Sequence, residues 1–343
     1  MIDFTHTLLA WYGANKRDLP WRNTSNPYLI WLSEIILQQT RIQQGWAYWE
    51  RFVERFPTVH QLAEATEDEV LRLWQGLGYY SRARNLHTAA KQIVAMGHFP
   101  NTMEEIKSLK GVGDYTAAAI GSMAFHLPVA VVDGNVYRVL ARYYAIDTPI
   151  NSTEGKKLFQ ELAQSLLPTN QAADFNQAMM DFGAIQCMPS SPKCTTCPLM
   201  EGCEAFRTTR VATFPVKLKT LKVKTRHLHY YYILHQGEVA IRRRGEGDIW
   251  QGLWEPYLEE ADNEGWLLNQ LIKQTITNTM KLLRTNVKHV LTHRILLANF
   301  TLVKVDKKPI LPKEYIWIQE DNMHNYAVPR LVEILLESIH DTY

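Results

Sequence analysis

This sequence of 343 residues has none of the features that mark a secreted or membrane-spanning protein. Its apolar stretch YLIWLSEIIL is interrupted by Ser33 and Glu34 and is too short to cross a bilayer. Residues 1–20 lack a basic region and a small-residue cleavage site, so we expect a cytoplasmic protein with no membrane partner. A net charge of +2 gives no global sign of an oppositely charged partner. Internal repeats and low-complexity segments are also absent.

The composition is ordinary for a globular protein, with 46% apolar and 21% charged residues. This length predicts two or three domains with sizeable cores. The charge is unevenly spread, because one segment carries seven basic residues and no acidic one. These residues are Arg207, Arg210, Lys217, Lys219, Lys222, Lys224 and Arg226. Such a run is as typical of a solvated linker as of a segment that contacts phosphate.

All the cysteines lie in one short segment, and no cysteine occurs elsewhere. Cys187, Cys194, Cys197 and Cys203 have the spacing C-x6-C-x2-C-x5-C. Four thiolates in one loop are a ligand set that suits an iron–sulfur cluster or zinc. Zinc sites more often have two separated C-x2-C pairs, whereas this segment has one, so the cluster is favoured. Disulfides are disfavoured because a reducing compartment is expected.

Hydrophobic periodicity divides the chain into a helical part and a mixed part. Apolar residues recur at helical spacing through residues 1–206, in stretches such as TEGKKLFQELAQSLL. Residues 207–226 have the composition of an inter-domain connector. The remainder has strand patterns at 227–236, 238–244, 295–305 and 314–320, and helical patterns at 261–283 and 328–340. The predicted fold class is a mainly α region followed by a small α/β domain.

The segment LKGVGDYTAAAIG predicts a tight turn between two helices that can bind an anion. Gly111 and Gly113 allow the backbone to turn and to bring its N–H groups close to a ligand. The next helix is expected to begin near Asp114, and its positive end faces the same place. In a DNA-binding protein the anion would be a backbone phosphate. An ordinary corner between two helices has the same pattern.

Two carboxyl groups have contrasting surroundings in the sequence. Glu34 lies among Ile, Leu and Trp in an apolar helix, where burial raises the pKa of a carboxyl and lets it donate a proton at neutral pH. Asp133 follows an extended apolar run and precedes a helix, so the helix N-terminus is expected to keep it ionised. An acid and a carboxylate suit cleavage of a glycosidic bond. A surface glutamate and a simple helix cap are the alternatives.

These motifs, together with several others, occur in the order found in the endonuclease III superfamily of DNA glycosylases. The chain most resembles the adenine DNA glycosylases of the MutY family, from about Trp11 to the last cysteine. The matching motifs are LPWR (19–22), WLSEIILQQT (31–40), GLGYYSRARNLH (76–87), LKGVGDYTAAAI, VVDGNVYRVLAR, FNQAMMDFGA (175–184) and the four-cysteine loop. The resemblance implies a helix-hairpin-helix fold with a [4Fe-4S] cluster. It assigns residues 26–132 to a six-helix module, and residues 1–25 and 133–206 to a cluster module.

The resemblance also implies roles for individual residues. Glu34 corresponds to the general acid that protonates adenine, and Asp133 to the carboxylate that stabilises the sugar cation. Asn135 and Tyr115 correspond to residues that assist around the sugar and its phosphate. Base removal requires extrusion of the nucleotide. The groups that fill or wedge the duplex correspond to Gln38, Gln39 and Tyr79.

Two further positions in the resemblance concern the base pocket and the reaction type. Arg22 and Asp181 fall where the family lines the pocket, although glutamate would be equally expected at position 181. Superfamily members with β-lyase activity carry a lysine where this chain has Tyr115, and that amine forms a Schiff base. A monofunctional glycosylase that leaves an abasic site is therefore expected. Weak lyase activity through another lysine is the alternative.

The C-terminal part resembles the Nudix-like domain of the same family. RRRGEGDIWQGLWEPY resembles the start of that domain, but the Glu-rich helix that holds Mg²⁺ is missing, so nucleotide hydrolysis is not expected. In the family, a Phe-Ser-His turn senses 8-oxoguanine opposite the adenine. Leu291, Thr292 and His293 occupy those places in VKHVLTHR. The Thr hydroxyl can still bond the lesion. A plain β-hairpin is the alternative for this segment.

The sequence therefore predicts a monomeric enzyme that removes adenine opposite 8-oxoguanine or guanine in double-stranded DNA. A bifunctional glycosylase/lyase acting on oxidised pyrimidines is the second hypothesis. A non-catalytic, cluster-bearing DNA-binding or redox protein is the third, and a Nudix hydrolase is the fourth. The function of the cluster, structural or redox-active, stays open.

Overall fold

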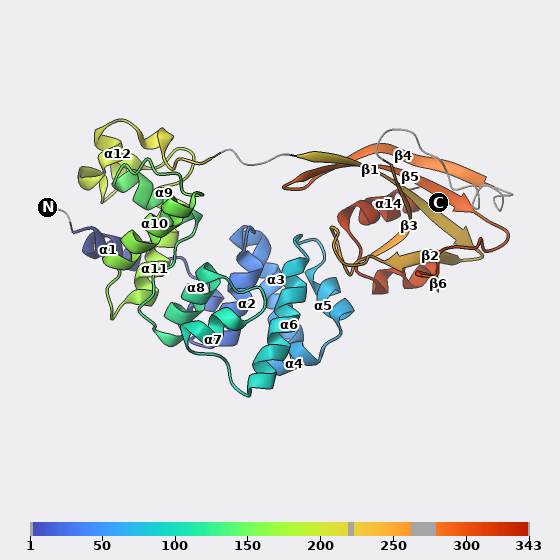
Figure 1. Ribbon diagram of the computed structural model, residues 1–343, viewed down its shortest axis with the longest axis horizontal. Coiled ribbons are helices and arrows are strands. Elements are labelled where there is room, and N and C mark those ends of the chain that lie inside the picture. Colours follow the sequence, from blue (N-terminus) through green and yellow to red (C-terminus); the bar gives the residue numbers. More distant parts are fainter. Residues whose placement is uncertain (1–2, 219–222, 262–278, 342–343) are drawn as a thin grey trace. The chain divides into compact units, whose positions relative to one another are not determined.

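The computed structural model describes residues 3–218, 223–261 and 279–341. The described chain forms two compact units (Figure 1). Unit 1 contains residues 1–64 and 88–219, and unit 2 contains residues 65–87 and 220–343. Helices make up unit 1, whereas unit 2 is built on one sheet, so the predicted fold class is confirmed.

Unit 1 consists of helices joined by short turns. Its elements are α1 (Phe4–Asn15), α2 (Pro27–Leu37), α3 (Ile42–Arg55), α4 (Val59–Glu64), α7 (Met103–Ser108), α8 (Asp114–Phe125), α9 (Gly134–Tyr143), α10 (Thr153–Leu166), α11 (Ala172–Asp181) and α12 (Glu204–Arg207). The π-helical segment η2 (Phe182–Gln186) extends α11, and α6 (Ser81–Met96) crosses the boundary between the units. Polar caps start several helices: Asn26 accepts from the Tyr28 N–H at α2, and Ser152 accepts from the Gly155 N–H at α10.

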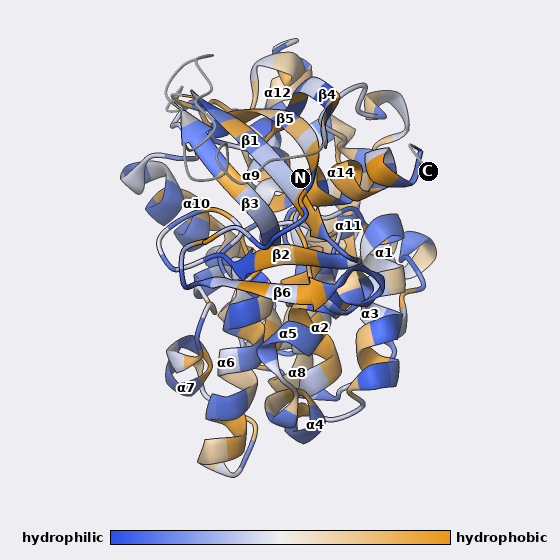
Figure 2. Cartoon of the chain, turned by 90° about the vertical axis from the view of Figure 1, so that its right-hand side faces the viewer, coloured by the Kyte–Doolittle hydropathy of each residue, from blue (hydrophilic) through white to orange (hydrophobic). Residues whose placement is uncertain are grey.

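Helix α2 is apolar all round, and this explains why it is buried. Eight of its eleven residues are buried, and hydrophobic residues cover it in Figure 2. It packs on α3 and α8. A helix with this composition cannot present a polar face to water, so its one charged side chain, Glu34, is taken into the interior.

The part of unit 1 that contains the cysteines has its own core. Buried side chains from α1, α9, α10 and α11 meet there, among them Leu8, Leu140, Phe159 and Phe175. Cys187, Cys197 and Cys203 pack against this cluster. The helices therefore hold the cysteine loop at one edge of a shared core.

Unit 2 contains a six-stranded sheet with the order β4-β5-β1-β3-β2-β6. The strands are β1 (Lys224–His235), β2 (Glu238–Arg243), β3 (Trp254–Ala261), β4 (Thr279–Val290), β5 (Arg294–Lys304) and β6 (Tyr315–Gln319). Strands β1 and β5 are parallel, and the other pairs are antiparallel. Alternation along β1 sends Tyr230 and Tyr232 to one face and Tyr231 and Ile233 to the other.

Helix α14 (Arg330–His340) covers one face of the sheet with an apolar side formed by Leu331, Val332, Leu335 and Ile339. Figure 2 shows this helix with both hydrophobic and hydrophilic residues, as its amphipathic sequence requires. The helical pattern at 328–340 is therefore confirmed.

The predicted helix over 261–283 is wrong at both of its described ends. Ala261 ends strand β3, and residues 279–283 begin strand β4, which pairs with β5 from Thr279 opposite Lys304. Residues 262–278 lie outside the described residues. The apolar positions of this segment fit a strand as well as a helix, and pairing with β5 decides between them.

Residues 65–87 belong to unit 2, although they are far from its strands in sequence. Helix α5 (Glu67–Trp74) is held there by Arg243, whose guanidinium lies 2.8 Å from Glu67. The Gln75 side chain donates to Glu333 in α14, and Arg84 donates to the Gln251 carbonyl at 2.6 Å. The turn that carries Tyr79 is thus attached to the sheet domain.

Much of the basic segment 207–226 is neutralised within the protein. Arg207 pairs with Glu204, Arg210 with Asp147, and Arg226 with Asp248 and Glu260. Lys219 and Lys222 lie outside the described residues. No helix in the described part of the chain has the length and hydropathy needed to cross a bilayer.

Candidate active site

A cavity of about 390 Å³ in unit 1 brings together five of the residues singled out from the sequence, including all four predicted catalytic residues. Glu34 comes from α2, Tyr115 from the first turn of α8, and Asp133 and Asn135 from the start of α9. Arg22 reaches the same cavity from the turn before α2. Segments separated by more than a hundred residues therefore contribute to a single site.

Glu34 is an acid in an apolar pocket. Its side chain is buried, and burial raises its pKa to about 7, with a further increase from Asp133. The Tyr115 hydroxyl donates to Oε2 at 2.8 Å, and this hydrogen bond opposes the increase. A carboxyl with such a pKa is partly protonated near neutrality and is suited to general acid catalysis.

Asp133 caps helix α9. Its Oδ1 accepts the backbone N–H groups of Asn135 and Val136, each at 2.8 Å. Burial nevertheless raises its pKa, while these hydrogen bonds act in the opposite direction. The expectation that the helix N-terminus favours the ionised form is therefore opposed by burial, because the cost of burying the charge outweighs the donors and raises the pKa of Asp133 overall.

Asn135 links the cap to the cysteine loop. Its Nδ2 donates to Asp133 Oδ2 at 2.7 Å, and its Oδ1 accepts from Arg138 at 2.8 Å. The Arg138 guanidinium also donates to the carbonyls of Gly183 at 2.6 Å and Cys187 at 2.8 Å. Asp133 is therefore held through a continuous chain of hydrogen bonds that ends at the first cysteine.

Asp181 lies behind the cavity wall and is fully buried. It accepts two hydrogen bonds from Arg22, at 2.6 and 2.8 Å, and others from the backbone and side chain of Arg17. Burial raises the pKa of Asp181, but the two arginines outweigh burial and lower it overall. Asp181 thus holds two guanidinium groups that line the cavity and is not itself part of the lining.

Sequence reasoning missed Arg17. It stands five residues before Arg22 in RDLPWR, and its charge next to this motif was the available signal. Met180 and Met123 also line the cavity and were not singled out, because isolated methionines are typical of any core.

The four cysteines surround one small cavity. Its lining also includes Arg142, which is buried and donates to the carbonyls of Met188 and Val211 and to the Cys187 sulfur at 3.4 Å. Burial raises the pKa values of Cys194, Cys197 and Cys203, and neighbouring thiols raise them further. Four clustered sulfurs beside a buried cation fit a thiolate-ligated metal group. In the described ranges no three or more His, Cys, Asp or Glu side chains are grouped as ligands of a single metal ion, so the fit to a thiolate-ligated group rests on the four sulfurs and the buried arginine that line this cavity.

The glycine turn connects α7 and α8. Gly111 has a φ of 78°, which disfavours other residues. Gly113 has a φ of −95°, so its backbone does not require glycine, and a Cβ there would meet no atom within 4 Å. No side chain caps the N-terminus of α8. The turn therefore presents open space beside a helix N-terminus.

Unit 2 contains another cavity, of about 520 Å³, between two turns. Tyr79 lies on one turn and Leu291, Thr292 and His293 lie on the other, where β4 joins β5. The hydroxyl groups of Tyr79 and Thr292 are 2.6 Å apart. Leu291 packs against the sheet core, whereas Thr292 and His293 are exposed.

Two predicted wedge residues have the left-handed backbone conformation. Gln39, just after α2, has a φ of 56°, and Tyr79 has a φ of 48°. Both side chains are exposed. Gln38 instead donates to the Thr116 hydroxyl at 3.1 Å. Non-glycine residues with positive φ are uncommon and cluster at functional sites.

Comparison with known proteins supports two family assignments. Residues 32–167 match the HhH-GPD superfamily base excision DNA repair protein model, and residues 229–338 match the NUDIX domain model. An adenine DNA glycosylase from Buchnera aphidicola is 33% identical, covering 98% of this chain and 96% of that protein. An adenine DNA glycosylase from Mus musculus is 43% identical over 60% of this chain and 42% of that protein. A solved thermostable thymine-DNA glycosylase is 32% identical, with a TM-score of 0.56, covering 60% of this chain and 95% of that one.

Replacing Glu34 with Gln should stabilise the protein more at alkaline than at acidic pH. Folding raises the pKa of the Glu34 carboxyl. The carboxyl therefore adds stability when the pH is below its pKa in the unfolded chain, and this contribution is lost as the pH rises through about 7. The shift from 4.5 to about 7 corresponds to about 3 kcal/mol, of which about 2 kcal/mol falls between pH 5 and pH 8. Thermal unfolding of the wild-type protein and of Glu34→Gln, each at pH 5 and pH 8, measures this difference in stability. A difference independent of pH would contradict the raised pKa.

Replacing Gly183 with Ala should destabilise unit 1. The added Cβ would lie 2.5 Å from the Cβ and 3.0 Å from the Cα of Asn135, so α9 must shift. Overpacking of this kind costs about 1–3 kcal/mol. Gly134→Ala is the matched control, because its Cβ would meet nothing within 4 Å. Equal thermal midpoints for the two variants would show that the contact between Gly183 and Asn135 is not tight.

Proposed function

We propose that this chain, which belongs to the adenine DNA glycosylase family, hydrolyses the N-glycosidic bond of adenine mispaired with 8-oxoguanine or guanine in double-stranded DNA. The proposal rests on two carboxyl groups that line the same cavity. Glu34 is a buried acid, and Asp133 is a carboxylate that accepts hydrogen bonds from three N–H donors. This arrangement matches the needs of base excision, in which a leaving base is protonated and a sugar cation develops.

Glu34 acts as the general acid. Its pKa of about 7 keeps part of the population protonated at neutral pH, so it can deliver a proton to a ring nitrogen of adenine. Tyr115 donates to Oε2 and holds the carboxyl in one orientation. After the base leaves, the resulting carboxylate can accept a proton from the attacking water.

Asp133 stabilises the positive charge that develops on the sugar. The N–H groups of Asn135 and Val136 and the Asn135 amide favour its charged form and fix its position. Arg22 and Arg17, held by Asp181, form the wall against which the base is bound. Asp181 thus has a positioning role in this proposal, and the arginines contact the base.

The reaction ends at an abasic site. A β-lyase needs an amine nucleophile, and position 115 has a phenol instead. The described lining of the catalytic cavity has three arginines and no lysine. An arginine guanidinium stays protonated and does not form a Schiff base.

DNA is bound through its backbone and by extrusion of the adenine. The turn containing Gly111 and Gly113 offers backbone N–H groups and the N-terminus of α8 to a phosphate. Gln38, Gln39 and Tyr79 are the residues that fill or wedge the duplex when the adenine is extruded. The preset left-handed backbone at Gln39 and Tyr79 reduces the ordering required when the duplex is wedged.

The base opposite adenine is read in unit 2. Thr292 carries a hydroxyl that can bond the O8 and N7–H edge of 8-oxoguanine, and the Tyr79 hydroxyl orients it at 2.6 Å. His293 lines the same cavity and is exposed. In this division of labour residues 1–206 perform excision, 207–226 link the parts, and 227–343 recognise the lesion.

The cysteines hold a [4Fe-4S] cluster. Cys187, Cys194, Cys197 and Cys203 would hold it through their thiolates, and Arg142 would offset part of the negative charge of the set. The Cys187 carbonyl accepts a hydrogen bond from Arg138, which connects the cysteine loop to the Asp133 cap through Asn135.

The central experiment is single-turnover cleavage of a labelled duplex with adenine opposite 8-oxoguanine, guanine or cytosine. Each sample is divided, and one half is treated with alkali. We expect strand breaks only after alkali and fastest opposite 8-oxoguanine, since base removal leaves an alkali-labile abasic site. Glu34→Gln should bind the duplex but release base at least 100-fold more slowly, in line with the usual contribution of a general acid.

Two other outcomes would change the assignment. Breaks without alkali, together with a borohydride-trapped adduct, would indicate a bifunctional glycosylase/lyase. Duplex binding without base release, by protein whose metal group is intact, would indicate a non-catalytic DNA-binding protein.

The metal group is identified by analysis of the purified protein. We expect about four iron and four acid-labile sulfide per chain, with broad visible absorbance. Cys197→Ser should lower the iron content and the thermal midpoint, while Thr196→Ser, at the neighbouring exposed position, should leave both unchanged. One zinc per chain without sulfide would contradict the cluster.

A further inference from the structure

The loop between β2 and β3 brings an aromatic residue to the lesion-reading cavity of unit 2. Trp250 lines this cavity together with Tyr79 and Thr292, and Ile249 lies beside it. The indole is partly buried against the sheet core and lies near the His289 ring, with centroids 5.9 Å apart. No other tryptophan lines this cavity within the described part of the chain.

The backbone of Trp250 has a conformation that a bulky residue rarely adopts. Its φ is 61°, in the left-handed region, where side chains with a Cβ are disfavoured. Residues held in this way persist when the surrounding structure fixes them, and they cluster at ligand sites.

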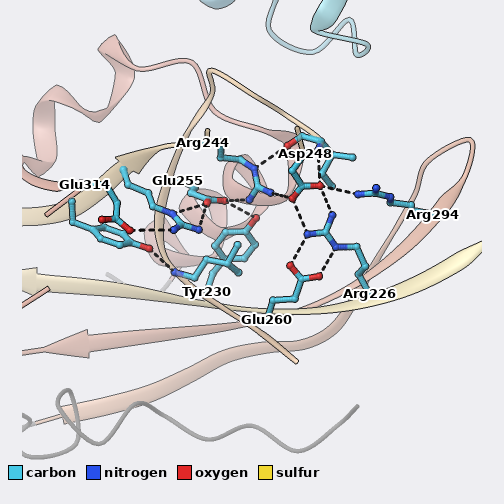
Figure 3. Close-up of polar contacts among 12 residues, drawn as sticks. Arg226, Tyr230, Arg244, Asp248, Glu255, Glu260, Arg294 and Glu314 are labelled. Atoms are coloured by element: carbon cyan, nitrogen blue, oxygen red, sulfur yellow. Dashed lines mark hydrogen bonds and ion pairs between the residues drawn. The ribbon is translucent and has the colours of Figure 1, made fainter. Parts of the chain in front are cut away.

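A partly buried ionic network fixes the backbone immediately before Trp250 (Figure 3). Asp248 accepts the Ile249 N–H at 2.7 Å, and Arg244 donates to the Ile249 carbonyl at 2.9 Å. Arg244 and Asp248 also pair with each other at 2.6 Å. The peptide groups on both sides of Ile249 are therefore bonded to the network.

Further partners make the network rigid. Arg226 and Arg294 bind Asp248 at 2.6 and 2.8 Å, and Glu255, which is fully buried, binds Arg244 at 2.5 Å. Although burial acts in the opposite direction, hydrogen bonds from Arg226, Ile249 and Arg294 hold the pKa of Asp248 well below its usual range. The guanidinium of Arg244 also lies 5.9 Å from the centroid of the Trp250 ring.

From this geometry we propose that Trp250 is a specificity-determining residue that shields the Tyr79–Thr292 pair from water when the base opposite adenine is bound, and that Asp248 and Arg244 position it. The proposal rests on the proposed function. A hydrogen bond discriminates more strongly in a site that excludes water, because the competing solvent is removed and the local dielectric is lower.

Loss of Trp250 should change excision opposite 8-oxoguanine and not excision opposite guanine. Only 8-oxoguanine presents an O8 and N7–H edge to Thr292, so loss of the shield should slow excision opposite 8-oxoguanine and spare excision opposite guanine. The expected decrease in the ratio of the two rates is about three- to tenfold, which corresponds to one ordinary hydrogen bond.

The test measures single-turnover rates for both duplexes with the full-length, metal-loaded protein. Trp250→Ala and Trp250→Gly both remove the ring, but glycine tolerates the positive φ and alanine does not. We expect the same loss of preference in both variants, while Trp250→Phe keeps most of it. Trp317→Ala, on strand β6 and outside the cavity, is the matched control and should retain the wild-type ratio.

Substitutions of Asp248 test whether it positions Trp250. Asp248→Asn should lower the ratio of the rate opposite 8-oxoguanine to the rate opposite guanine, and Asp248→Glu should restore part of this ratio. A merely structural role would slow both reactions equally.

Two results distinguish a wrong assignment of the function from a wrong assignment of the role of Trp250. A wild-type protein that releases no adenine from either duplex overturns the proposed function itself. A wild-type protein that prefers 8-oxoguanine, with Trp250→Gly retaining the full preference, overturns the role of Trp250 and leaves the proposed function intact. If Trp250→Ala does not fold, the glycine and phenylalanine variants still decide between these outcomes.

Discussion

The guanidinium of Arg138 is the connection on which the geometry of unit 1 depends. It is nearly fully buried and donates to Asn135, Gly134, Gly183 and Cys187, so it joins the start of α9 to the π-helical segment and to the cysteine loop. A buried cation requires such partners, because leaving it unpaired costs several kcal/mol. Because Asn135 in turn holds Asp133, the position of the carboxylate and the course of the loop are set by one side chain.

The two carboxyl groups of the candidate active site show how similar burial can serve different roles. The Glu34 carboxyl accepts a hydrogen bond from the Tyr115 hydroxyl, and burial raises its pKa to about 7. Asp133 is also buried enough to raise its pKa, but it has three N–H donors that oppose the effect. The number of donors separates an acid from a carboxylate within one cavity. Neither a helix position nor burial alone accounts for the difference.

Residues 229–338 match the NUDIX domain model, and carboxylates in unit 2 are paired with arginines. Two acidic residues near the cavity lined by Tyr79 and Trp250 form ion pairs. Glu255 pairs with Arg242 and Arg244. Asp248 pairs with Arg226, Arg244 and Arg294. These carboxylates are bonded to arginines instead of being arranged for Mg²⁺, which agrees with the missing acidic helix in the sequence. The network holds the backbone before Trp250 through the N–H and carbonyl groups of Ile249.

Local sequence determined much of the architecture. The apolar helix around Glu34, the cap at Asp133, the positive φ at Gly111 and the alternation along β1 follow from short-range patterns, since each depends on neighbours a few residues away. The resemblance carried by several motifs together predicted which residues share a site. It could not show that Asp181 lies behind the cavity and holds Arg17 and Arg22, because these contacts join segments about 160 residues apart and exist only in the folded chain.

Other features were decided by tertiary structure alone. The segment from residue 279 became a strand because β5 offered a partner, although its apolar pattern fitted a helix. Residues 65–87 joined unit 2, and Trp250 came to face Tyr79 and Thr292, through contacts between segments about 40 to more than 200 residues apart. Sequence by itself determines periodicity, caps and ligand sets, which are local. Long-range pairing and the cost of burying charge determine which of these meet, and both exist only in the folded chain.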